Sequence, residues 1–169
     1  MNRKKRKVSR SLTGLEVLGI AIRSEVEAHR FYTQVLKRVR NPILREKLLR
    51  LAAEEKKHRH ILEERYKKST GEEFPPLPTK GGPEGKGTIP KSLTAAGVLQ
   101  IAIKMERQAA SFYQREAQKS TDRSGSFMLE YLADFERSHE RTLEAEWKAL
   151  KRFPDWFSSP DPMVMLVGP

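Results

Sequence analysis

Two Glu-x-x-His motifs hold the residues of this sequence that are best suited to chemistry. Glu55 precedes His58 by three positions, and Glu136 precedes His139 by the same number. Residues three apart on a helix share one face, so each motif would present a carboxylate beside an imidazole. These two groups are common ligands of divalent transition metals. The sequence therefore offers the donors of a metal site.

Two more glutamates stand where they could complete such a site. Glu25 lies 30 positions before Glu55, and Glu106 lies 30 positions before Glu136. The midpoint of the first pair is position 40, next to Asn41-Pro42, and that of the second is position 121, inside Ser120–Ser124. Both segments are rich in turn and helix-capping residues. In an antiparallel hairpin each glutamate pair would therefore meet at one level.

The chain repeats itself at an offset of 81 positions. Ile20-Ala21-Ile22 returns as Ile101-Ala102-Ile103, and Phe31-Tyr32 returns as Phe112-Tyr113. Such a repeat predicts two copies of one supersecondary unit, here a helical hairpin. The same offset relates the proposed ligands of the two halves: Glu25 to Glu106, Glu55 to Glu136 and His58 to His139.

Apolar residues at helical spacing surround all six of these residues, which predicts that they face a core. Four uncompensated carboxylates in a core would repel one another and lose their hydration. Two divalent ions would neutralise them. The alternative, glutamates on a charged helix surface, suits the residues that lie off the stripes: Glu27, Glu46, Glu54, Glu63 and Glu64.

We predict an all-α four-helix bundle of two hairpins, with helices at about 13–40, 42–68, 94–119 and 125–151. Residues 13–151 form the bundle, with hairpins at 13–68 and 93–151 joined by a Pro/Gly-rich linker at 69–92 that is long enough to run the length of the bundle. Residues 1–12 are a basic tail, and residues 152–169 are an apolar tail with three alternative roles: packing on the bundle, a subunit contact or a docking peptide.

Composition narrows the chemistry further. The sequence has no cysteine, which excludes thiolate metal sites and cysteine nucleophiles. The formal net charge is +11, and the first ten residues carry six of the basic side chains. We interpret this tail as a solvated terminus, with nucleic-acid binding as the alternative. No apolar run is long enough to span a membrane, and we expect a cytoplasmic protein.

The motif pattern resembles the ferritin-like di-iron carboxylate family, and within it the rubrerythrin branch. The resemblance implies two iron ions, with Glu55 and Glu136 as bridging carboxylates and His58 and His139 as nitrogen ligands. It implies terminal ligands at Glu25 and Glu106, and tyrosines that hydrogen-bond to ligand carboxylates at Tyr32 and Tyr113. Rubrerythrins carry an extra glutamate where this chain has Ala109, and many carry a four-cysteine iron domain. The ligand set is thus closer to ferritin-type and oxidase-type centres.

His29 lies one helical turn after Glu25 on the same stripe, whereas its repeat partner is Ala110. Two interpretations are open: a hydrogen bond from His29 to a ligand, or a core histidine bonded elsewhere.

The function implied is that of a non-haem di-iron oxidoreductase in oxidative-stress defence or iron handling. Two Fe(II) ions would react with peroxide or O₂, as a peroxidase or a ferroxidase. Manganese and zinc also suit these ligands. We expect an external electron donor if the protein is a reductase, and a homo-oligomer such as a dimer, with domain swapping as an option. The alternatives are iron storage or cargo in a larger assembly, and a DNA-associated protector of the Dps type.

Overall fold

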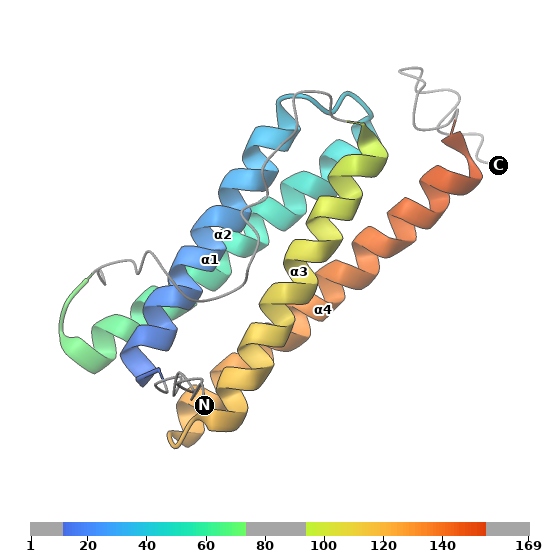
Figure 1. The fold of residues 1–169 in the computed structure, drawn as a ribbon. Coiled ribbons are helices and arrows are strands. Elements are labelled where there is room, and N and C mark those ends of the chain that lie inside the picture. The colour runs from blue at the N-terminus through green and yellow to red at the C-terminus, as the bar shows by residue number, and fades with distance from the viewer. Residues whose placement is uncertain (1–11, 74–93, 155–169) are drawn as a thin grey trace, which may run out of the picture.

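The computed structural model describes residues 12–73 and 94–154. These residues form four helices, namely α1 (Gly14–Leu36), α2 (Pro42–Thr70), α3 (Ala95–Lys119) and α4 (Arg123–Arg152). Figure 1 shows α1 and α2 as one antiparallel hairpin and α3 and α4 as a second one beside it. The predicted all-α four-helix bundle is confirmed.

The two hairpins face each other along corresponding helices. Across the junction α1 contacts α3 and α2 contacts α4. In Figure 1, α2 ends and α3 begins at opposite ends of the bundle. Most of the segment predicted as a linker, most of the basic tail and most of the apolar tail lie outside the described residues.

Short capping motifs fix where the hairpins begin and turn. Thr13 and Glu16 form a reciprocal capping box at the start of α1, with contacts of 2.7 and 3.2 Å. At the first turn, the Asn41 side chain accepts from the Leu44 amide at 2.9 Å, and Pro42 occupies the first helical position. These local signals hold each helix in the register that brings its glutamate to the middle of the bundle.

Several helix boundaries differ from the sequence prediction by one to four residues, and side-chain contacts explain two of these differences. Helix α1 ends at Leu36 instead of near residue 40, and the Arg45 guanidinium donates to the main-chain carbonyls of Leu36 and Val39 beyond the helix end. Helix α4 begins at Arg123, two residues early, because the Asp122 carboxylate caps it and accepts from the next main-chain amides. Long-range side-chain contacts of the Arg45 type leave no periodic signal in the sequence.

The hydrophobic core is divided into two clusters by a polar layer. One cluster includes Ile20, Leu62, Tyr113 and Leu132, and the other includes Tyr32, Leu48, Leu99 and Leu143. The six predicted ligands belong to neither cluster and are buried between them. The bundle therefore encloses a polar site with apolar packing above and below it.

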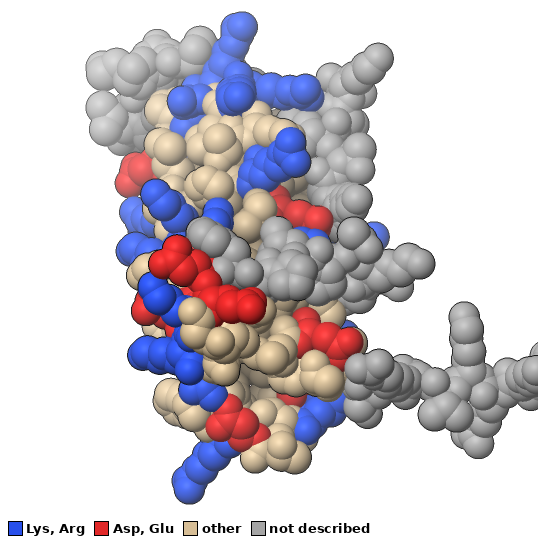
Figure 2. All heavy atoms as spheres, turned by 90° about the vertical axis from the view of Figure 1, so that its left-hand side faces the viewer, with Lys and Arg blue, Asp and Glu red and all other residues tan. Residues whose placement is uncertain are grey.

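The outside of the bundle is charged. On the face drawn in Figure 2, lysine and arginine side chains run along the whole length with acidic side chains among them. None of the described helices is both long and apolar enough to cross a membrane.

Candidate metal centre

The structure brings all six predicted ligands together at the middle of the bundle. Each of the four helices contributes a glutamate, and α2 and α4 each add a histidine one turn further on. Their relative exposures are Glu25 1%, Glu55 1%, His58 3%, Glu106 2%, Glu136 1% and His139 4%. Ionisable side chains are rarely this buried unless they are paired or bind a metal.

The six side chains divide into two overlapping groups of four. One group is Glu25, Glu55, His58 and Glu136, and the other is Glu55, Glu106, Glu136 and His139. Within each group, one ligand atom from every residue lies within 4.8 Å of the others. Glu55 and Glu136 belong to both groups. This sharing is the geometry expected of two neighbouring ions joined by two carboxylates.

The histidines turn the same ring nitrogen toward the carboxylates. Nδ1 of His58 lies 3.4 Å from Glu136 Oε1, 3.5 Å from Glu25 Oε2 and 3.6 Å from Glu55 Oε2. Nδ1 of His139 lies 3.2 Å from oxygens of both Glu55 and Glu136, and 3.9 Å from Glu106. The two imidazole rings stack with their centroids 5.6 Å apart. Each Nδ1 is thus placed where it could share an ion with the neighbouring carboxylates.

Two buried tyrosines link the hairpins through the outer glutamates. The Tyr32 hydroxyl on α1 donates to Glu106 Oε1 on α3, and the Tyr113 hydroxyl on α3 donates to Glu25 Oε1 on α1. Both tyrosines are fully buried. Each bond occupies one oxygen of a carboxylate and leaves the other to face the centre, so the carboxylate is oriented as a ligand would be.

Unpaired polar atoms provide a test of whether the residues fit metal ions. Among the described residues, the buried side-chain atoms without a hydrogen-bond partner are concentrated here: Glu25 Oε2, Glu55 Oε1, His58 Nδ1, Glu136 Oε1, Glu136 Oε2 and His139 Nδ1. Buried polar atoms are nearly always satisfied in folded proteins. These atoms are carboxylate and imidazole donors that converge on two points. The site therefore fits a pair of divalent ions.

Without metal the cluster holds protons that it would not hold in water. Burial raises the pKa of Glu55 and Glu106 well above the ordinary carboxyl value, and the charge of Glu136 raises both further. Burial also raises the pKa of Glu136, but the close contacts with the His139 and His58 imidazoles outweigh it and bring the value to about 2. A metal pair would replace these protons as the compensating charge.

The pKa values of the two histidines also lie far from the ordinary imidazole value, because the same buried carboxylates surround their rings. Burial lowers the pKa of His58, but its close contacts with the carboxylates of Glu136, Glu25 and Glu55 outweigh burial and raise it to about 11. Burial likewise lowers the pKa of His139, whereas the close contact with Glu136 and the charge of Glu106 raise it to about 9. Both imidazoles are therefore protonated at neutral pH when no ion is bound.

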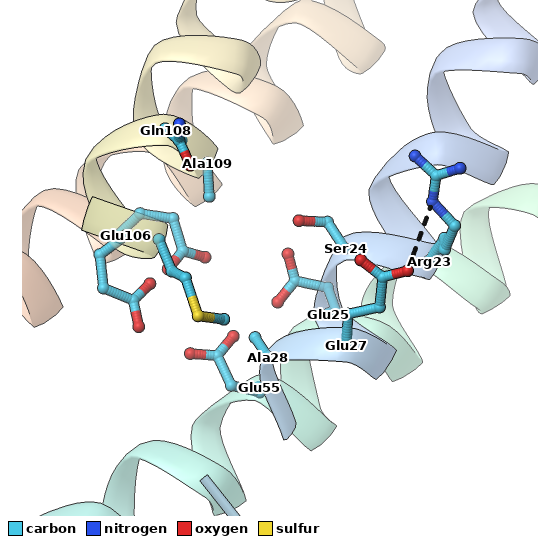
Figure 3. A pocket seen from close by; sticks show the side chains of 11 residues that line it. Arg23, Ser24, Glu25, Glu27, Ala28, Glu55, Glu106, Gln108 and Ala109 are labelled. Carbon is cyan, nitrogen blue, oxygen red and sulfur yellow. Dashed lines mark ion pairs between the residues drawn. The ribbon is translucent and has the colours of Figure 1, made fainter. Parts of the chain in front are cut away.

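A small cavity reaches the centre between α1 and α3. Its volume is about 20 Å³, enough for one water-sized molecule. In Figure 3, Glu25, Glu55 and Glu106 surround this space, and Ala28 from α1 and Ala109 from α3 lie on opposite sides of it. The small side chains at these two repeat-related positions leave room that a larger residue would fill.

The structure favours the second interpretation of His29. Its Nδ1 lies 2.8 Å from the main-chain carbonyl oxygen of Ala52 on α2. This contact joins α1 to α2 one turn before Glu55.

Glu54, which sequence reasoning assigned to the charged surface, is a contact of the site. Its side chain is 30% exposed, and its Oε2 lies 2.9 Å from Nε2 of His139. The repeat partner of Glu54 is Phe135, whose ring packs edge-on against His58 at a centroid distance of 5.1 Å. In the sequence, the contact of Glu54 with the site could have been suspected only from this mismatch between the repeats, because both residues lie off the apolar stripes.

The comparisons with known proteins agree with this geometry. The rubrerythrin family model matches residues 16–147. A solved structure of a hypothetical protein from Pyrococcus furiosus is similar, with 31% sequence identity and a TM-score of 0.72, covering 84% of this chain and 92% of that one. No curated protein matches significantly. The chain belongs to the rubrerythrin family.

Replacing Glu106 with glutamine distinguishes the contribution of this residue to folding stability from its contribution to metal binding. The pKa of Glu106 is raised in the folded state, so the stability that comes with its protonated form is lost as pH rises through that pKa. Glutamine stays neutral and can still accept from Tyr32. We expect the unfolding free energy of metal-free Glu106→Gln at pH 7 to be unchanged or higher by up to about 3 kcal/mol. The stabilisation by added Mn(II) should largely disappear.

Urea unfolding with and without Mn(II) measures both effects. Glu130→Gln on exposed α4 surface is the matched control and should keep the metal-dependent stabilisation. A Glu106→Gln protein that is stabilised by Mn(II) as much as the wild type would contradict the assignment of Glu106 as a ligand.

Metal affinity should rise with pH. An ion must displace the protons held by His139 and His58, whose pKa values are about 9 and about 11, so binding releases protons at any pH below about 9. Mass action then increases the apparent affinity about tenfold per pH unit for each proton released. Isothermal titration between pH 6 and 8 in buffers of different ionisation enthalpy measures the affinity and the protons released. A pH-independent affinity would contradict this account.

Proposed function

We propose that this protein is a di-iron oxidoreductase that binds two iron ions between Glu55 and Glu136 and reacts them with peroxide or O₂. The observation that carries the proposal is the pair of four-residue groups that share these two carboxylates. Membership of the rubrerythrin family supports iron as the metal. The four carboxylates carry four negative charges, which balance two divalent ions.

Iron would supply the electrons: two ions passing from Fe(II) to Fe(III) provide the two electrons that, with two protons, convert one peroxide to two waters. The protein's own residues determine where and how this occurs. Glu25 and Glu106 are held by the tyrosine hydroxyls, so their free oxygens are aimed before any ion arrives. Such preorganisation lowers the cost of assembling the site.

The surroundings control what reaches the centre. The apolar clusters on either side exclude bulk water, which strengthens the electrostatic interactions inside the site. The opening beside Ala28 and Ala109 admits a molecule about the size of water. Peroxide and O₂ are small enough for such a route, whereas an organic substrate would require the helices to move.

The direct test is anaerobic loading with Fe(II) followed by mixing with peroxide or with O₂. We expect about two irons per chain and a ferric absorbance that grows on mixing, and the two rates would show which oxidant is preferred. Glu55→Ala should lose most of the second iron and slow the reaction at least about a hundredfold, because Glu55 belongs to both groups.

Glu64→Ala, an exposed residue of the same helix, is the control and should behave as the wild type. Circular dichroism would check that the variants retain their helices. Failure of the folded wild-type protein to bind iron, manganese or zinc in stoichiometric amounts would refute the proposal.

A further inference from the structure

The repeat that builds the centre is broken at one position beside it. Glu54 directly precedes Glu55, and the equivalent residue of the second half, Phe135, directly precedes Glu136. Both side chains contact a histidine, and each contacts the histidine of the opposite hairpin. The two groups of ligands therefore have different neighbours although their own residues are the same.

On one side, the His139 ring is held by a charged hydrogen bond. Glu54 Oε2 lies 2.9 Å from Nε2 of His139. A carboxylate only accepts, so Nε2 carries the hydrogen, and once an ion has displaced the proton of Nδ1, that nitrogen offers its lone pair on the side of Glu55 and Glu136, each 3.2 Å away. A carboxylate on the far nitrogen fixes the tautomer and the ring orientation, and it makes the near nitrogen a stronger donor.

On the other side, an aromatic ring takes the place of the carboxylate. Phe135 meets His58 with centroids 5.1 Å apart and ring planes at 77°. Phe135 also packs on Tyr131, with centroids 4.7 Å apart. A phenyl ring restricts His58 by packing but offers neither an acceptor oxygen nor a negative charge. His58 therefore lacks the support that Glu54 gives to His139.

Glu54 also changes the charge around the pair of groups. It is a fifth carboxylate near the centre, and it approaches His139 from the side away from the other four. A cation next to His139 feels this charge more strongly than one next to His58, because Coulomb attraction falls with distance. The stronger donor nitrogen of His139 and the negative charge of Glu54 thus both favour metal binding at the position next to His139.

We infer that Glu54 is a positioning residue that makes the metal position of Glu106 and His139 the tighter of the two, so that it is filled first. The inference rests on the proposed function, since it concerns the same pair of ions. The position of Glu25 and His58, covered by Phe135, binds more weakly and is filled second. The protein thereby holds one retained ion and one more exchangeable ion in a site built from a repeat.

The test is an anaerobic titration of the full chain with Fe(II) in competition with a chromophoric chelator. The wild type should bind two ions in two steps whose affinities differ at least about tenfold. Glu54→Leu should weaken the tighter step about 10-fold to 100-fold and leave the weaker step and the stoichiometry unchanged. Glu54→Gln, which can still accept from Nε2, should restore part of the loss.

Three further variants assign the steps. Glu64→Leu makes the same change at an exposed position of α2, and Phe135→Leu removes only the aromatic ring; both should keep the tighter step. His139→Ala should abolish the tighter step, and His58→Ala the weaker one. Equal affinities in the wild type, an unaffected Glu54→Leu, or loss of the tighter step in His58→Ala would overturn the inference. These results differ from failure of the proposed function, in which the wild type binds no iron.

Discussion

The burial of four carboxylates in one layer of a helical bundle is the constraint on which the rest of this structure depends. Glu25, Glu55, Glu106 and Glu136 are each at most 2% exposed and lie close enough to repel one another. Desolvation and mutual repulsion would cost several kcal/mol for each carboxylate if nothing compensated its charge. Protonated histidines and shared protons provide the compensation in the metal-free protein, and two divalent ions would provide it in the loaded one.

The architecture follows from holding this layer in place. The two apolar clusters on either side supply the packing that the polar layer cannot, and each sends one tyrosine hydroxyl into the layer. Each tyrosine donates a hydrogen bond to a glutamate of the other hairpin. The same contacts therefore join the two hairpins and orient the glutamates as ligands. The tyrosine hydrogen bonds thus hold Glu25 and Glu106 in place, and a small cavity beside Ala28 and Ala109 reaches the site.

The sequence could predict the bundle and the six converging residues because three independent patterns agree on them. Helical periodicity put them on core faces, the hairpin midpoints put them at one level, and the repeat put the hairpins together. The sequence could not predict Glu54, which lies off the apolar stripe and reaches His139 across the bundle. Nor could it predict the early end of α1 at Leu36, which the Arg45 side chain caps from the next helix.

The central claim is that this layer holds two ions bridged by Glu55 and Glu136, and anomalous diffraction from crystals grown with iron tests it most directly. The account predicts two peaks per bundle, one within reach of Glu25 and His58 and one within reach of Glu106 and His139, with both shared carboxylates between them. A bundle whose six side chains keep their present contacts with no peak among them, or with a single central peak, would contradict it.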